Sequence, residues 1–277
     1  MSSGKYDKRN TLNDLTGKEW LKLSSSFWFS EKCAADKDAL RHPAPFLIKD
    51  IEKLISLFTK EKMVVLDIFC GSGTTLLSAY NLKRQGIGFD LNLEYLDLAR
   101  ERFVRNHCNL NALDYRVGDN TKLLQELEDE SIDYIVTSPP YFNILKNKAS
   151  GLRANKSEKG FRNGARQGIQ SYGDDNFNLE NSKNYEEFLE KIFSIFSECR
   201  RVLKTKKYLS IIISDFTIDK KEVCVTGDIV RIMQKANFEF VGNIALLQNN
   251  KPLYPFGYPY AYKINHHNQN ILNFRKT

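Results

Sequence analysis

The sequence predicts an α/β protein built on a mostly parallel sheet of seven strands. Short apolar runs alternate with segments in which apolar residues recur at helical spacing, as in successive βαβ units. The run 63–69 is apolar almost throughout, as expected for a strand buried on both faces. Glycines follow that run, and a helical pattern opens directly after them. These observations favour parallel strands joined by right-handed crossovers.

Each predicted strand is a short apolar run, and each predicted helix repeats apolar residues every three to four positions. The predicted strands are 63–69, 86–89, 113–117, 132–136, 208–214, Phe238–Leu247 and 271–274. The predicted helices are Gly17–Leu23, 46–58, 75–82, Leu93–Arg105, 121–127, 185–203 and 225–236.

The length of 277 residues suits one large domain with appendages. We expect residues 1–41 to form an N-terminal arm and residues 42–277 to form the main domain, with a basic insert at about 143–184. No stretch approaches the roughly 20 apolar residues needed to cross a bilayer, and the N-terminus lacks the apolar core of a signal peptide. The expectation is a cytoplasmic protein with no membrane partner.

Cysteines and charge narrow the classes of function. None of the five cysteines forms a CxxC pair or lies near a histidine at metal-ligand spacing, so reduced structural thiols and no metal are expected. The formal net charge of +7 permits a nucleic acid partner, although many basic proteins bind no polyanion.

The turn after the first predicted strand has the features of a ligand site. Gly71 and Gly73 allow positive φ and close approach of a ligand to the backbone, and the helix beyond them offers free N–H groups. Asp90, at the end of the next strand, is placed to accept both hydroxyls of a ribose, and Asp119, after the third, to reach an adenine amino group. The spacing fits neither GxGxxG nor GxxxxGK[ST], which disfavours nicotinamide, flavin and ATP. The plain alternative is a glycine turn that only links a strand to a helix.

A second motif follows the predicted strand 132–136. Ser138 provides a hydroxyl, Pro139 and Pro140 stiffen the chain, and Tyr141 provides a flat stacking surface. These groups suit a planar heterocycle that bears an exocyclic amino group. Taken alone, the motif is also compatible with a simple proline turn. Because ligands bind at the carboxyl ends of strands in open α/β sheets, its pairing with the glycine turn favours a site.

Together the two motifs resemble those of the S-adenosylmethionine-dependent DNA amino-methyltransferases, which modify N4 of cytosine or N6 of adenine. The resemblance implies a doubly wound, Rossmann-like methyltransferase fold with an antiparallel last strand. It implies a catalytic tetrad at Ser138, Pro139, Pro140 and Tyr141. The segment His42–Phe46 is similar to the one that leads into the cofactor turn of this family. The implied cofactor-binding residues are Asp67, Phe69, Gly71, Ser72, Gly73, Thr74, Asp90, Asp119, Pro45 and Phe46.

The chemistry at such a tetrad is positioning and polarisation, because the amine is a poor nucleophile and the sulfonium methyl group is already activated. Ser138 Oγ and the Pro139 carbonyl can accept the two amino hydrogens, while Tyr141 stacks on a flipped-out base. In the family, serine at the first position leans towards N4 of cytosine. We therefore expect site-specific cytosine-N4 DNA methylation, with N6 of adenine as the alternative.

The insert is rich in lysine and arginine at its start. We expect contacts with the phosphates of double-stranded DNA there. The candidate DNA-binding residues are Lys146, Lys148, Arg153, Lys156, Lys159, Arg162 and Arg166. A solvated loop without a partner is the alternative.

Sequence recognition is expected from the insert, the aromatic segment 251–262, the N-terminal arm or a companion restriction or recognition subunit. Ordinary packing between the last two strands is an equally good explanation of the aromatic segment. Two further functions stay open, namely an RNA or protein-glutamine methyltransferase with a similar tetrad and a non-catalytic nucleic-acid-binding subunit.

Overall fold

The computed structural model describes residues 5–42, 45–142, 179, 182–219, 221–249 and 251–277. Its strands are β1 Phe27–Phe29, β2 Val64–Asp67, β3 Gln85–Asp90, β4 Asp114–Val117, β5 Ile132–Thr137, β6 Leu203–Ile213, β7 Phe216–Ile218, β8 Lys221–Val223, β9 Phe238–Leu247 and β10 Asn268–Lys276. Its α-helices are α1 Gly17–Leu23, α2 Ile48–Phe58, α3 Thr74–Asn81, α4 Leu93–Arg105, α5 Asn120–Gln125, α6 Tyr185–Val202 and α7 Val225–Lys235. Single 3₁₀ turns occur at Ala34–Asp36, Ala39–Arg41 and Leu110–Ala112.

The main sheet has the strand order β1-β9-β10-β6-β5-β2-β3-β4. All neighbouring strands pair in parallel except β10, which runs antiparallel to both β6 and β9. The predicted fold class and the antiparallel last strand are thus confirmed. From β2 the chain continues to β3 and β4 on one side and to β5 and β6 on the other. Such a reversal opens a crevice at the carboxyl ends of the strands.

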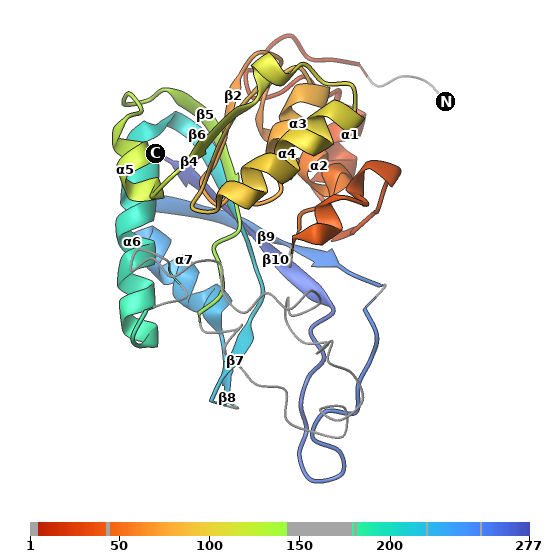
Figure 1. The fold of residues 1–277 in the computed structure, drawn as a ribbon, viewed down its shortest axis with the longest axis vertical. Helices are drawn as coiled ribbons and strands as arrows, with labels where there is room; N and C mark the ends of the chain where they lie inside the picture. Colours follow the sequence, from red (N-terminus) through yellow and green to blue (C-terminus); the bar gives the residue numbers. More distant parts are fainter. Residues whose placement is uncertain (1–4, 43–44, 143–178, 180–181, 220, 250) are drawn as a thin grey trace.

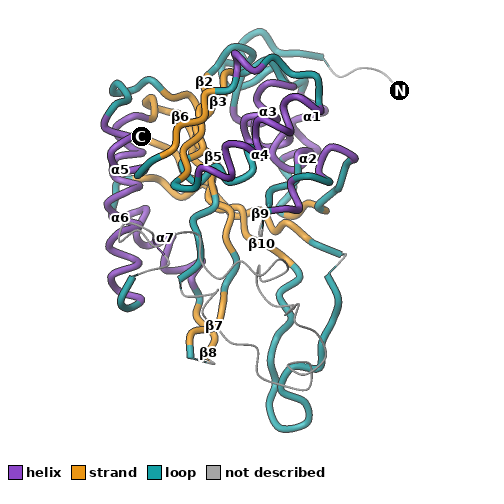
Figure 2. The backbone as a smooth tube through the Cα atoms, in the orientation of Figure 1, coloured by secondary structure: helices purple, strands orange, loops and turns teal. Residues whose placement is uncertain are grey.

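Helices cover both faces of the sheet (Figures 1 and 2). The helices α5, α6 and α7 pack on one face through a core that includes Phe188, Phe196 and Met233. The helices α2, α3 and α4 lie on the other face over Val65 and Tyr134 and their neighbours. The sheet is therefore buried between two helical layers, which fixes the strand ends relative to one another.

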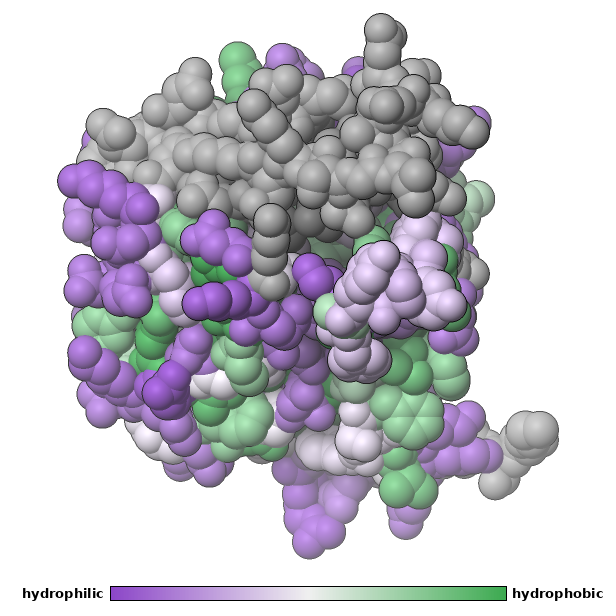
Figure 3. Space-filling view, turned by 90° about the horizontal axis from the view of Figure 1, so that it is seen from below, coloured by the Kyte–Doolittle hydropathy of each residue, from purple (hydrophilic) through white to green (hydrophobic). Residues whose placement is uncertain are grey.

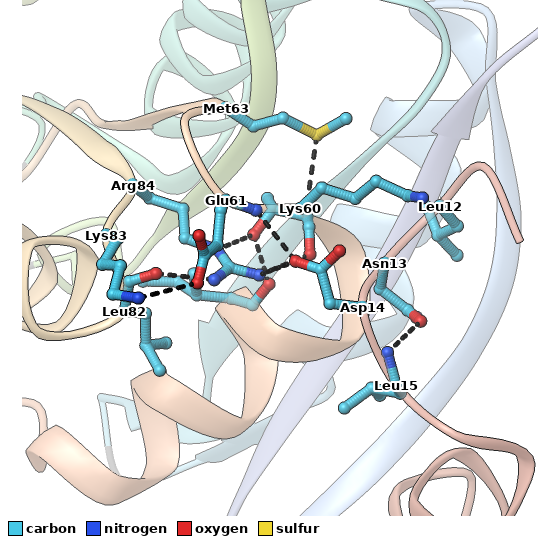
Figure 4. Close-up of polar contacts among 12 residues, drawn as sticks. Leu12, Asn13, Asp14, Leu15, Lys60, Glu61, Met63, Leu82, Lys83 and Arg84 are labelled. Atoms are coloured by element: carbon cyan, nitrogen blue, oxygen red, sulfur yellow. Dashed lines mark hydrogen bonds and ion pairs between the residues drawn. The ribbon is translucent and has the colours of Figure 1, made fainter. Parts of the chain in front are cut away.

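The N-terminal segment is integrated into this fold. The strand β1 pairs with β9 and forms an eighth, edge strand, where seven strands were predicted. Asn13 Nδ2 donates a hydrogen bond to the Leu57 carbonyl at 2.6 Å. The Asp14 carboxylate accepts from Glu61 N at 2.9 Å and pairs with Arg84 at 3.2 Å (Figure 4). Asn13, Asp14 and β1 therefore contact the part of the chain that follows residue 42.

A second difference from the sequence-based expectations is the small antiparallel hairpin of β7 and β8, which follows β6 directly. The helices in the described part of the chain include none with the length and apolar character needed to span a membrane.

Candidate active site

The glycine turn after β2 is held by hydrogen bonds to its backbone carbonyls. Gly71 and Gly73 have φ of +49° and +74°, the left-handed region in which glycine is favoured. The Tyr115 hydroxyl donates to the Gly71 carbonyl at 2.8 Å. The buried Arg102 of α4 donates through Nη1 to the Ser72 carbonyl at 2.6 Å. These bonds hold the turn in one shape at the carboxyl end of β2.

Asp67 connects the two predicted motifs from behind. This fully buried carboxylate accepts from the Thr75 hydroxyl at 2.6 Å and from the Thr137 hydroxyl at 2.7 Å. Thr75 lies in the first turn of α3, and Thr137 ends β5 immediately before Ser138. Burial raises the pKa of Asp67 to about 6. Asp67 thus fixes the glycine turn and the tetrad relative to each other, although it does not itself line the cavity.

Two other carboxylates stand at the ends of β3 and β4. Asp90 accepts a hydrogen bond from Gly71 N at 2.8 Å and one from Asn92 N at 3.0 Å, and burial raises its pKa. Asp119 caps α5, since its Oδ1 accepts from Thr121 N at 2.9 Å. Its other oxygen, Oδ2, is buried and has no hydrogen-bond partner among the described residues. A ligand with a donor group in the cavity would satisfy this oxygen.

The glycine turn and the tetrad line a single cavity. The empty space between its lining residues, open solvent at the mouth included, is about 1010 Å³. All four tetrad residues line it. The predicted cofactor-binding residues that line it are Pro45, Phe46, Phe69, Gly71, Ser72, Thr74, Asp90 and Asp119. Asp67 and Gly73 lie behind the turn, and the seven predicted DNA-binding residues, 146–166, lie outside the described part of the chain.

The tetrad rests on an aromatic cluster. The Tyr141 ring lies 5.5 Å from the Phe216 ring, centroid to centroid, and Phe216 in turn meets Tyr185 edge-on. The Tyr185 hydroxyl donates to Asp228 at 2.8 Å, which anchors the cluster on α7. Tyr141 is therefore supported from behind while it borders the cavity.

The polar residues of the cavity wall that sequence analysis missed include His42, Asn120 and Gln269. His42 lies beside Gly71, and its ring packs against Tyr95 at 4.5 Å. Gln269 reaches the cavity from β10, and its Oε1 accepts a hydrogen bond from Gln248 Nε2 at 3.1 Å. For His42 the sequence did hold a signal, since this residue opens the segment His42–Phe46. No local pattern marks Gln269, because its place depends on β10 inserting between β6 and β9.

The chain belongs to the N6/N4-type DNA methylase family. The family model, described as DNA methylase, matches residues 2–101 and 132–277, and a general methyltransferase-domain model matches residues 65–156. This membership and the fold confirm S-adenosylmethionine as the predicted cofactor. In the described part of the chain, no group of His, Cys, Asp or Glu side chains is placed to hold a metal ion.

Curated relatives are similar to part of the chain. The Type II methyltransferase M.HpaI of Haemophilus parainfluenzae is 32% identical over 126 residues, which are 44% of this chain and 38% of the relative. M2.DpnII of Streptococcus pneumoniae is 38% identical over 105 residues, 38% of this chain and 37% of the relative. The matches thus span little more than a third of these relatives. The solved structure of TrmN from Thermus thermophilus has a TM-score of 0.51 at 16% identity, covering 88% of this chain and 52% of that one, which shows a shared fold.

Proposed function

We propose that this protein transfers a methyl group from S-adenosylmethionine to the N4 amino group of a flipped-out cytosine in DNA. The observation that carries the proposal is the shared cavity of the Gly71 turn and the Ser138 tetrad. Asp67 bonds to both elements through two threonine hydroxyls, so the donor side and the acceptor side have a fixed separation.

The donor side fits the cofactor. S-adenosylmethionine supplies an electrophilic methyl group carried on a sulfonium. The Oδ2 of Asp119, which has no partner among the described residues, would accept from the adenine amino group, and Asp90 would accept from the ribose hydroxyls. The Gly71–Thr74 turn would hold the methionine part, because its positive-φ glycine lets a ligand approach the backbone.

The acceptor side fits a nucleobase amine. Ser138 Oγ and the Pro139 carbonyl can accept the two amino hydrogens, which shifts the nitrogen towards sp³ and frees its lone pair for attack. Base flipping costs a few kcal/mol, and stacking on Tyr141 returns about 1–3 kcal/mol of it. The Gln269 amide, held by Gln248, is available to the ring nitrogen beside the amine.

We favour cytosine over adenine as the target because serine at the first position of the tetrad leans towards N4 of cytosine in the family. The contacts of Ser138, Tyr141 and Gln269 suit both bases, since cytosine N3 and adenine N1 are both acceptors beside an amino group. N6-adenine methylation is therefore the competing outcome. The basic residues of the insert are proposed to position the duplex by phosphate contacts, and a companion recognition subunit is a further proposal.

The test incubates the protein and tritiated S-adenosylmethionine with unmethylated DNA, RNA and ribosomal protein, and then analyses digested nucleosides by mass spectrometry. The proposal expects label in DNA as N4-methylcytosine. N6-methyladenine in the DNA would show that the target atom is N6 of adenine. Label only in RNA or protein would show that the substrate is not DNA. DNA binding without any label would favour a non-catalytic subunit. A Ser138→Ala preparation, purified in parallel, excludes a contaminating methylase.

A further inference from the structure

The connection between β9 and β10 projects from the end of the sheet that carries the cavity (Figure 1), and Figure 3 views the molecule from that end. Three of its tyrosines are almost bare, with Tyr258 80%, Tyr260 94% and Tyr262 89% exposed. Tyrosine usually buries its ring and leaves only the hydroxyl in water. Several bare rings on one loop therefore indicate a surface that contacts another molecule.

Hydrogen bonds hold this loop at its neck and at its tip. At the neck, Asn265 accepts from Tyr254 N at 3.0 Å and donates to the Tyr254 carbonyl at 2.9 Å. At the tip, Tyr260 N and Ala261 N both donate to the Gly257 carbonyl at 2.8 Å. Gly257 has φ of +78°, and a Cβ there would lie 2.2 Å from the Ala261 oxygen. The rings are thus presented by a hydrogen-bonded backbone, which lowers the entropy lost when they bind.

Position and charge indicate the kind of partner. The loop begins after Gln248 and returns before Gln269, and these two side chains are bonded at the cavity wall. From residue 240 to residue 277 the sequence has no Asp or Glu, whereas Lys251 and Lys263 flank the tyrosines. A surface that combines aromatic rings with positive charge suits a polyanion with stackable bases.

We propose that the loop 251–263 contacts double-stranded DNA and that its exposed tyrosines stack on bases left unstacked when the target base leaves the helix. This inference rests on the proposed function, since it needs a flipped base. The loop then stabilises the opened duplex from the rim, while Tyr141 stacks on the extruded base inside the cavity. Lys263 supplies a phosphate contact beside the rings.

The test compares wild type with a Tyr258→Ser/Tyr260→Ser variant by fluorescence anisotropy. The probes are a mixed-sequence duplex and the same duplex with a central mismatched bubble. The wild type should prefer the bubble, and the variant should bind it about tenfold more weakly because base–aromatic stacking is lost. The variant should keep the wild-type salt dependence, whereas Lys263→Gln should lower the slope by about one, since the lysine contacts a phosphate and the tyrosines do not.

A matched control replaces an aromatic residue far from the loop, namely Trp20→Ser on α1, and it should bind both probes like the wild type (Figure 1). Unchanged bubble binding by the tyrosine variant overturns the inference. So does a change in its sedimentation without a change in DNA binding, because the rings would then serve a second copy of this chain. If the wild type binds S-adenosylmethionine but neither probe, the proposed function fails as well. If the wild type methylates DNA and the tyrosine variant binds the bubble as tightly as the wild type does, only the loop inference fails.

Discussion

At the scale of single residues, the two carboxylate oxygens of Asp119 have different surroundings. Its Oδ1 caps α5 through Thr121 N and Thr121 Oγ1, at 2.9 and 2.8 Å. Its Oδ2 is buried beside the cavity and has no partner among the described residues. An unpaired buried oxygen lowers stability, and a bound amino group removes that cost. Mutation can separate the capping of α5 from the proposed contact with the cofactor.

Asp119→Asn should weaken S-adenosylmethionine binding about tenfold or more, because an amide N–H₂ would replace the acceptor of a hydrogen bond worth about 1.5–3 kcal/mol. The melting temperature should change little, since asparagine caps helices as well as aspartate does. Titration calorimetry measures the affinity. Asp119→Ala is the control that should lose both properties. Wild-type affinity in the asparagine variant would show that Oδ2 does not meet the cofactor.

Asp67 makes a prediction about pH. Burial raises its pKa from 3.8 to about 6, so the folded state binds the proton more tightly than the unfolded state does. Its contribution to stability is therefore fully present below about pH 4 and is lost as pH rises through 6. Asp67→Asn lacks this ionisation and can keep its bonds to Thr75 and Thr137. Urea unfolding should show the variant gaining stability relative to wild type as pH rises from about 4 to about 6, with no further gain above about pH 7. A difference independent of pH would contradict the assignment.

At the scale of elements, the turn depends on how closely α4 approaches α3. A Cβ on Gly73 would lie 2.7 Å from the Ala99 Cβ of α4. The same helix places Arg102 under the Ser72 carbonyl. The glycine therefore serves helix packing as well as turn geometry, and this explains why it lies behind the cavity wall.

Gly73→Ala should lower the free energy of unfolding by about 1–3 kcal/mol, from the clash and from the positive φ. Adding Ala99→Gly should recover the part due to the clash and leave the part due to φ. Denaturant unfolding of the single and double variants measures both parts. Gly17→Ala is the matched control, because nothing lies within 4 Å of its added Cβ and no cost is expected. An equal loss in that control would remove the packing explanation.

At the scale of the whole molecule, sequence patterns predicted the strands, turns and helices that depend on interactions between neighbouring residues. The apolar run at 63–69, the glycines after it and the helix Leu93–Arg105 all have their signals in neighbouring residues, and the structure contains them. The strand β1 has no such signal, since it is three residues long and joins a partner more than 200 residues away. Gln269 and the bond from Asp67 to Thr137 likewise arise only when distant strands meet. The shared cavity was expected from topology, because both motifs end parallel strands.

The most direct test of the account is methyl transfer by Ser138→Ala under single-turnover conditions, with cofactor affinity measured on the same preparation. Ser138 lines the same cavity as the Gly71 turn, so its loss should slow transfer to DNA by about 10²- to 10³-fold. S-adenosylmethionine affinity should stay at the wild-type value. Transfer at the wild-type rate, or a matching loss of cofactor binding, would contradict a shared cleft in which this hydroxyl holds the amine.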